Sequence, residues 1–205
     1  MSKPPVDSNT DRLPGAKDSL PLSRVVVFCV IVAAGCAADL LTKQLVFAWL
    51  GLPLGDPDRH TYWIFPHYVG IQTAVNQGAL FGMGQGMSLW FAVLSVVAFA
   101  GVVYWLFFRK AARDWLLTIS LSMICGGILG NLYDRLGLWH GADALERFQN
   151  GVRDWILFQY PPYVWPNFNL ADSLLVCGAG LLLWHAFFRR SVAEERQASE
   201  LRSVA

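Results

Sequence analysis

Long runs of apolar residues are the feature that most constrains this chain. Residues 88–108 and 115–133 contain no charged side chain, and neither does 173–188. The hydrocarbon core of a bilayer is about 30 Å thick, so a helix needs about 20 mostly apolar residues to cross it. A further run, 25–50, is interrupted only by Asp39 and Lys43. The sequence therefore predicts four membrane-spanning helices, at about 24–50, 88–108, 115–134 and 169–188.

The composition leads to the same class of protein. Hydrophobic residues make up 55% of the 205 residues and charged residues only 15%, whereas a soluble domain has roughly a quarter charged residues. The net charge of +1 is too small for a general nucleic-acid binder. All four cysteines lie in apolar runs with no CxxC pair, which argues against a disulfide framework and against a zinc site. We expect an all-α membrane protein.

The first apolar run has one alternative interpretation, a cleaved signal peptide. Basic residues precede it, and Val32-Ala33-Ala34-Gly35-Cys36 loosely resembles a lipoprotein cleavage box. The apolar pattern continues well past Cys36, as far as Leu50, so we favour a retained helix.

The positions of Lys and Arg predict how the helices are oriented. Eleven of the sixteen basic residues lie in the N-terminal arm, the loop 109–113 or the C-terminal tail, whereas the segment 51–87 holds only Arg59. Because cytoplasmic segments carry an excess of Lys and Arg, both termini are predicted to be cytoplasmic. We expect a disordered arm at 1–22, a membrane domain at 23–190 and a disordered tail at 191–205.

The first outer loop is predicted to contain a small β/loop subdomain. Within 67–75, apolar residues alternate in part with polar or small ones, which indicates one or two strands lying on the membrane surface. Aromatic residues there fit interfacial anchors equally well.

Polar residues gather at the outer ends of the predicted helices. Asp39 and Lys43 are one helical turn apart and can pair. Each polar cluster by itself has an ordinary explanation as an ion pair, a helix cap or a turn. If the helices bundle, the clusters meet at one level of the membrane, and two carboxylates there can share a proton as in an aspartic protease. The other clusters are Asn76 with Gly78, Asn131 with Asp134 and Arg135, and Asn169 with Asp172.

Four motifs resemble, in order, those of the lipoprotein signal peptidases, also called signal peptidase II. They are DLLTK at 39–43, NQGALF at 76–81, GILGNLYDR at 127–135 and FNLADS at 168–173. The resemblance covers about 25–188. It implies an aspartic endopeptidase of the bacterial inner membrane, with its active site near the outer face. Such an enzyme cuts diacylglyceryl-modified prolipoproteins just before the lipidated cysteine.

The resemblance also implies roles for individual residues. Asp172 would be one catalytic carboxylate, and Asn169 would orient it. No metal or organic cofactor is implied, and the expected partners are prolipoproteins and membrane lipid, with the enzyme itself a monomer. The supporting and substrate-placing network would consist of Asp39, Lys43, Asn76, Gly78, Asn131, Asp134 and Arg135.

The second catalytic aspartate departs from the family pattern. The family context of Gly or Val, one residue, Asp and an aromatic residue occurs here at Gly151-Val152-Arg153-Asp154-Trp155, but further downstream than in the family. Asp143 lies nearer the usual spacing and lacks the aromatic neighbour. Surface insertions are tolerated well, so we favour Asp154 and interpret 136–150 as containing an insertion.

Two functions from other classes also fit the polar clusters. A small transport or proton-relay protein would use Asp39 with Lys43 and Asp134 with Arg135 as intramembrane charge pairs, and its charged groups should recur through the depth of the bilayer. A purely structural membrane subunit would use the same residues as helix caps, and Asp172→Asn would then have almost no effect.

Overall fold

The structure is a computed structural model, and it describes residues 20–78, 84–140 and 148–204. Within these residues, four helices are long and apolar enough to cross a membrane. They are α1 (Leu22–Leu50), α2 (Ser88–Val103, continued by the π-helical turn η3, Tyr104–Phe108), α3 (Trp115–Arg135) and α4 (Leu170–Val204). A short 3-10 turn, η4 (Ala111–Arg113), leads from η3 into α3. These helices cover the four segments that the sequence predicts to span the membrane.

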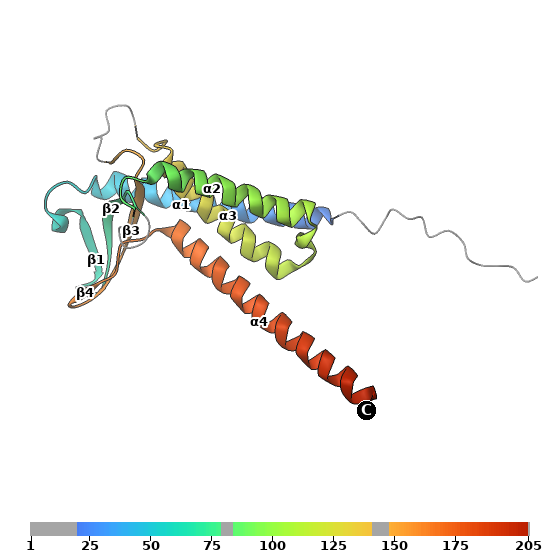
Figure 1. Cartoon of the computed structure of the whole chain (residues 1–205). Helices are drawn as coiled ribbons and strands as arrows, with labels where there is room; N and C mark the ends of the chain where they lie inside the picture. Colours follow the sequence, from blue (N-terminus) through green and yellow to red (C-terminus); the bar gives the residue numbers. More distant parts are fainter. Residues whose placement is uncertain (1–19, 79–83, 141–147, 205) are drawn as a thin grey trace, which may run out of the picture.

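A small antiparallel sheet lies at the end of the bundle where α1 ends and α4 begins (Figure 1). Its strands are in the order β1 (Thr61–Phe65), β2 (Val69–Asn76), β3 (Val152–Tyr160) and β4 (Tyr163–Val164), and the turn η1 (Pro57–His60) precedes them. The strand predicted within 67–75 is β2, and the sheet is the predicted β subdomain. β3 comes from beyond α3 in sequence, so its pairing with β2 brings the two outer segments together.

The register of β2 and β3 decides which side chains face the helices. Asp154 pairs with Ala74 and Arg153 with Val75. Neighbouring residues of a strand point to opposite faces, so Arg153 and Asp154 leave β3 in opposite directions.

Helix α3 lies between α1 and α4 and packs closely against both because small residues line its contacts. A methyl group at Gly126 would lie 3.4 Å from the carbonyl oxygen of Val32 on α1. At Gly127 it would overlap the carbonyl oxygen of Ala171 on α4. Small residues let membrane helices approach closely when no water drives them together.

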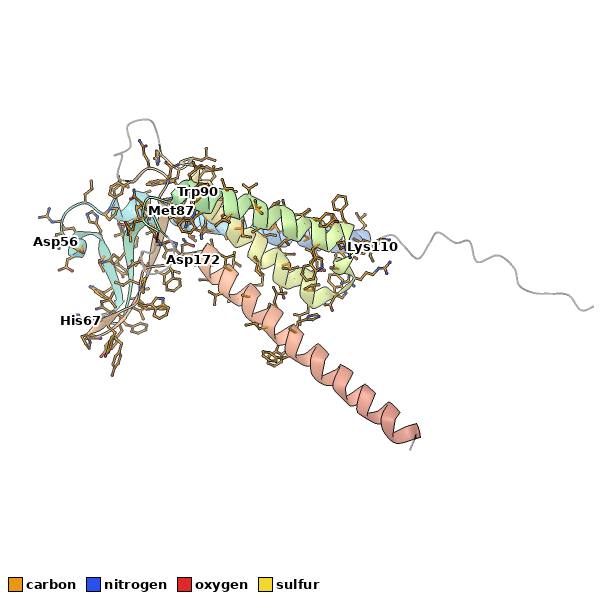
Figure 2. The ribbon with its side chains drawn as sticks, viewed as in Figure 1. Asp56, His67, Met87, Trp90, Lys110 and Asp172 are labelled. Atoms are coloured by element: carbon orange, nitrogen blue, oxygen red, sulfur yellow. The ribbon has the colours of Figure 1, made fainter. Side chains whose placement is uncertain are left out.

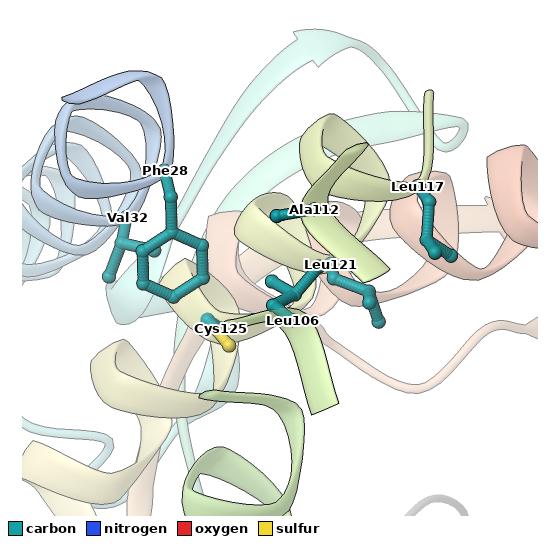
Figure 3. Packing of buried hydrophobic residues seen from close by; sticks show 7 residues of the cluster. All are labelled: Phe28, Val32, Leu106, Ala112, Leu117, Leu121 and Cys125. Atoms are coloured by element: carbon teal, nitrogen blue, oxygen red, sulfur yellow. The ribbon is translucent and has the colours of Figure 1, made fainter. Parts of the chain in front are cut away.

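The opposite end of the bundle is held by an apolar cluster from α1, η3, η4 and α3 (Figure 3). Phe28 meets Phe107 edge-on, with ring centroids 5.1 Å apart. Asp114 caps α3 by accepting from the backbone N–H of Leu117 at 3.0 Å, and its other oxygen lies 2.7 Å from Nε2 of His185 on α4. The buried cluster consists of Phe28, Val32, Leu106, Ala112, Leu117, Leu121 and Cys125.

The structure describes the two predicted tails to different extents. Residues 1–19, within the arm for which we predict disorder, lie outside the described residues. Helix α4 continues to Val204, through the segment 191–204 for which the sequence analysis predicts disorder. That segment contains Ala, Glu and Arg, which have high helix propensity.

Candidate active site

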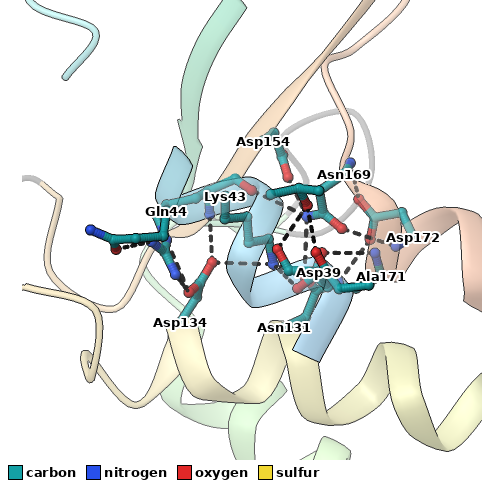
Figure 4. Close-up of polar contacts among 12 residues, drawn as sticks. Asp39, Lys43, Gln44, Asn131, Asp134, Asp154, Asn169, Ala171 and Asp172 are labelled. Atoms are coloured by element: carbon teal, nitrogen blue, oxygen red, sulfur yellow. Dashed lines mark hydrogen bonds and ion pairs between the residues drawn. The ribbon is translucent and has the colours of Figure 1, made fainter. Parts of the chain in front are cut away.

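Two ionisable residues of α1 begin the site. Asp39 and Lys43 are both fully buried, and Nζ of Lys43 lies 2.7 Å from Oδ2 of Asp39. The same ammonium group donates to Oδ1 of Asn131 at 2.9 Å and lies 3.2 Å from Oδ2 of Asp134. An ammonium group has three N–H donors, and each has an acceptor here. An unpaired buried charge would be very costly, so these contacts allow Lys43 to lie in the bundle (Figure 4).

The C-terminal turns of α3 supply the acceptors for Lys43 and extend the network to α4. Oδ1 of Asn131 also accepts from Nδ2 of Asn169 at 3.1 Å, and Nδ2 of Asn131 donates to Oδ1 of Asp172 at 2.8 Å. Gly130 precedes Asn131, and a methyl group there would overlap the Asp39 carboxylate. The glycine therefore leaves room for the Asp39 carboxylate against α3.

The first turn of α4 is closed by reciprocal side-chain caps. Oδ1 of Asn169 accepts from the backbone N–H of Asp172 at 3.0 Å, and Oδ2 of Asp172 accepts from the backbone N–H of Asn169 at 3.2 Å. This is the geometry of a capping box. The backbone N–H of Ala171 donates to Oδ1 of Asp39 at 2.9 Å. Helix capping, the ordinary explanation of this motif, is therefore correct, and the same side chains also reach the other carboxylates.

Asp154 enters the site from β3. It is 3% exposed, and its Oδ1 accepts from Nδ2 of Asn169 at 2.7 Å. The Asn76 side chain also hydrogen-bonds to it. Burial raises the pKa of Asp154 well above its usual range, and the negative charge of Asp172 raises it further. The charge of Lys43 and the two amide hydrogen bonds oppose this rise without cancelling it.

Asn169 therefore joins two carboxylates that come from different elements. Its side-chain amide donates to Asp154, while its backbone N–H and side-chain carbonyl engage Asp172. Asp172 is only partly buried, and each of its oxygens accepts one N–H donor. Two like charges held so near one another favour a shared proton. Such a pair can supply an acid and a base side by side.

Arg135 connects this centre to the segment that follows β2. Its Nη2 donates to the carbonyl oxygen of Gly78 at 3.1 Å, and its guanidinium carbon lies 4.9 Å from the centre of the Phe91 ring. The backbone N–H of Gly78 in turn donates to Oδ1 of Asn76 at 2.9 Å. Arg135 also interacts electrostatically with Asp154 and Asp172.

The structure thus brings all ten predicted site residues into one connected cluster at the sheet end of the bundle. Figure 2 shows Asp172 at this end and Lys110 at the other. Asp143, the alternative to Asp154, lies outside the described residues. Among the described residues, no group of three or more His, Cys, Asp or Glu side chains is placed to hold a metal ion.

Sequence reasoning missed Arg153, which is 2% exposed and paired with Asp134. It also missed Ser88 and Asn150, whose contacts hold Arg135: the Ser88 hydroxyl donates to the Asn150 carbonyl, and Asn150 Nδ2 donates to the Arg135 carbonyl at 2.8 Å. The available signal for Arg153 was a charged residue in a mostly apolar strand, where a buried charge requires a partner.

An apolar groove runs along α1 beside this site. Residues of α1 from Phe28 to Leu40 form one wall, and Phe99 of α2 and Leu129 of α3 contribute to the other. Its volume is about 460 Å³. Twelve residues of helix correspond to about 18 Å, so the groove follows a large part of the membrane thickness.

Comparisons with known proteins agree with this architecture. Residues 31–188 match the model of a family described as signal peptidase (SPase) II. The lipoprotein signal peptidase of Rhodopirellula baltica is 52% identical over 170 residues, covering 82% of this chain and 75% of that protein. The lipoprotein signal peptidase of Symbiobacterium thermophilum is 32% identical over 156 residues, covering 76% and 91%. A bacterial membrane enzyme structure at 2.3 Å resolution shares the fold, with a TM-score of 0.64 and 23% identity over 84% of this chain and 92% of that one.

Proposed function

Because this chain belongs to the signal peptidase II family, we propose that it cleaves as an aspartic endopeptidase with Asp154 and Asp172 as its catalytic pair. The enzyme is a protease of the bacterial inner membrane that removes the signal peptide from prolipoproteins. The observation that carries the catalytic assignment is the bridge by Asn169 between a buried and a partly exposed carboxylate.

The environments of the two carboxylates favour different roles. Asp154 is buried and has a raised pKa, so it is the member that holds the shared proton. Asp172 accepts N–H donors on both oxygens, which suits the ionised form and the role of general base. Pairs whose environments differ in this way divide into acid and base.

A balanced reaction follows from these roles. Asp172 takes a proton from a water molecule whose oxygen attacks the scissile carbonyl carbon, while Asp154 donates its proton to the carbonyl oxygen. The resulting diol then collapses: the C–N bond breaks, Asp172 returns its proton to the leaving nitrogen, and a hydroxyl proton goes back to Asp154. Each carboxylate ends in its starting state.

The groove beside the site suits the lipid of the substrate. The proposed substrate carries diacylglycerol on the cysteine after the cleaved bond, and acyl chains need an apolar surface within the membrane. The groove along α1 offers such a surface beside the polar cluster. The contacts that join Asp154 and Asp172 come from within one chain, so the proposed pair needs no residue from a second subunit, and we propose that the enzyme acts as a monomer.

The orientation of the enzyme is likewise proposed from charge. The loop around Lys110 lies at the opposite end of the bundle from Asp172 (Figure 2), and basic loops face the cytoplasm. Both termini are then cytoplasmic, and the catalytic pair lies near the outer face. Asp39, Lys43 and Asp134 are in contact with one another at the same end as the proposed pair, whereas the proton-relay alternative requires charged groups through the depth of the bilayer.

The direct test is cleavage of a diacylglyceryl-modified prolipoprotein by the purified full-length protein. We expect Asp154→Asn and Asp172→Asn each to reduce the rate by about 10²–10⁴-fold, with thermal unfolding in detergent showing a folded protein. Asp143→Asn is the matched control and should remain active. Loss of activity at 143 with retention at 154 would move the pair, and full activity of Asp172→Asn would support the structural alternative.

A pH series sharpens the assignment of Asp154. Its raised pKa means that its favourable contribution to folding is complete below the usual pKa of Asp and is lost as pH rises through the raised value. Asparagine has no proton to lose, so Asp154→Asn should gain stability over the wild type as pH rises. Thermal unfolding at pH 4 and pH 8 measures this, and a difference independent of pH would contradict the raised pKa.

A further inference from the structure

We propose that Arg153 is a positioning residue for this reaction: it holds the strand that carries Asp154 against α3 and balances the charge of Asp134. The inference rests on the proposed function, because it takes Asp154 as catalytic. Arg153 is adjacent to Asp154 in the chain and faces the opposite side of β3.

Arg153 binds a single carboxylate with both its side chain and its backbone. Nε and Nη2 donate to Oδ1 of Asp134 at 3.1 and 2.8 Å, and the backbone N–H donates to Oδ2 at 2.9 Å. Asp134 is fully buried and belongs to α3. These contacts hold β3 to α3 one residue before Asp154, so they limit how far the Asp154 carboxyl can move from Asn169.

Three further side chains, two from α1 and one from the segment after α3, enclose the guanidinium group. Nη1 donates to Oε1 of Gln44 on α1 at 3.3 Å. The guanidinium carbon lies 5.1 Å from the Trp139 ring and 6.0 Å from the Phe47 ring, distances at which a cation is attracted to an aromatic face. Trp139 belongs to the segment 136–150 that we interpret as containing an insertion. Part of that segment therefore covers Arg153.

Charge balance gives Arg153 a second effect. The buried carboxylates of Asp39 and Asp134 both contact the single ammonium group of Lys43. With Arg153 present, two cations pair with these two carboxylates, and Arg135 adds a longer-range attraction for Asp134. Without Arg153, Lys43 is left to pair with both carboxylates, and one more uncompensated negative charge remains close to the catalytic pair. A like charge disfavours ionisation of its neighbours, so the pair would hold its protons to higher pH.

The test compares three variants of the full-length enzyme over a range of pH. Arg153→Met should reduce kcat by about 10²-fold, as expected from a misplaced catalytic group. It should also move the acid limb of the pH–rate profile to higher pH by about 1 unit, with KM little changed. Arg153→Met combined with Asp134→Asn removes one charge of each sign, so it should return the acid limb to its wild-type position while kcat stays low.

Arg153→Lys keeps the charge balance and weakens only the anchoring of β3. It keeps the charge but loses the planar group that binds Asp134 through two nitrogens, so kcat should fall while the acid limb stays in place. If Arg153→Met does not fold, Arg153→Lys and the double variant test the positioning role instead. Arg59→Met, at an exposed arginine of η1, is the matched control and should behave as wild type.

Two results would overturn the inference. One is a folded Arg153→Met or Arg153→Lys protein with wild-type kcat. The other is a fall in kcat with an acid limb that stays in place in Arg153→Met, which would leave only a structural anchor. Failure of the proposed function is distinguishable, because it would appear as retained cleavage by Asp154→Asn whatever the Arg153 variants do.

Discussion

Helices α3 and α4 show how little hydropathy says about packing inside a membrane. Their most apolar 18-residue windows have the same mean hydropathy, yet 67% of that window is buried in α3 and 11% in α4. Helix α4 packs against α3 as far as His185, which contacts Asp114, and lies at the side of the bundle, whereas α3 lies between α1 and α4 (Figure 1). Hydropathy therefore predicts that both helices cross the bilayer and does not distinguish a central helix from a peripheral one.

The difference lies in the size of the side chains. Helix α3 has Gly126, Gly127 and Gly130 at its contacts, and its buried Ser120 and Ser122 hydroxyls donate to carbonyls of its own preceding turn, both at 2.6 Å. Bilayer lipid is as apolar as leucine, so close packing and satisfied polar groups decide which helix becomes central. Helix α4 instead exposes large apolar side chains: Val176, Leu183, Trp184 and Phe187.

The start of α4 is an exception, and it contributes to the candidate site. Asn169, which caps the helix, and Ala171 are fully buried, although only 11% of the apolar window of the helix is buried. The peripheral helix thus contributes its capped N-terminus to the site, where free backbone N–H groups meet the carboxylate of Asp39. Central and peripheral helices meet at this end through polar contacts.

The largest expected effect comes from truncating a leucine in each helix. Leu121 of α3 is 4% exposed and Leu183 of α4 is 61% exposed. We expect Leu121→Ala to lower the free energy of unfolding by about 2–5 kcal/mol, because it leaves a cavity. Leu183→Ala should change it by about 0.5 kcal/mol or less. Unfolding in mixed detergent micelles measures both, and equal losses would mean that α4 packs as tightly as α3.

A pair of glycine substitutions should produce a smaller effect with opposite signs. At Gly127 a methyl group overlaps backbone of α4, so Gly127→Ala should destabilise by about 1–3 kcal/mol and reduce cleavage. At Gly180 no described atom lies within 4 Å, so Gly180→Ala should stabilise by about 0.5–1 kcal/mol through helix propensity. Thermal unfolding of the two variants side by side checks the signs; a stable Gly127→Ala protein would show that α4 is free to move outward.

The smallest expected effect concerns the contact between the two helices at the end of the bundle away from the candidate site. Replacing His185 removes its 2.7 Å contact with Asp114 and should lower stability by about 0.5–1.5 kcal/mol. His185→Gln is preferable to a change at Asp114, which also caps α3. Cleavage should remain close to wild type, since the proposed catalytic pair lies at the other end. A large loss of activity would show that the packing of α4 on α3 at this end influences the site.

The sequence predicted which residues gather at the candidate site better than it predicted how they are held there. Resemblance to a family selected Asp154, Asp172 and their supporting residues, and the structure places them together. The resemblance did not select Arg153. This residue pairs with the buried carboxylate of Asp134, which lies 19 positions away in the chain, so no local pattern points to it. Nor did the resemblance show that Asn169 both caps α4 and reaches Asp154, since local capping patterns carry no information about the strand opposite.

Sequence by itself determined the number of membrane crossings and the residue types of the polar cluster, because both depend on local composition: hydrocarbon admits apolar helices and excludes unpaired charges. Tertiary structure alone decided which helix is central, how β2 and β3 register, and which partner neutralises each buried charge. These depend on contacts between distant segments. The position of Asp154 opposite Ala74, with Arg153 turned toward Asp134, results from that long-range pairing.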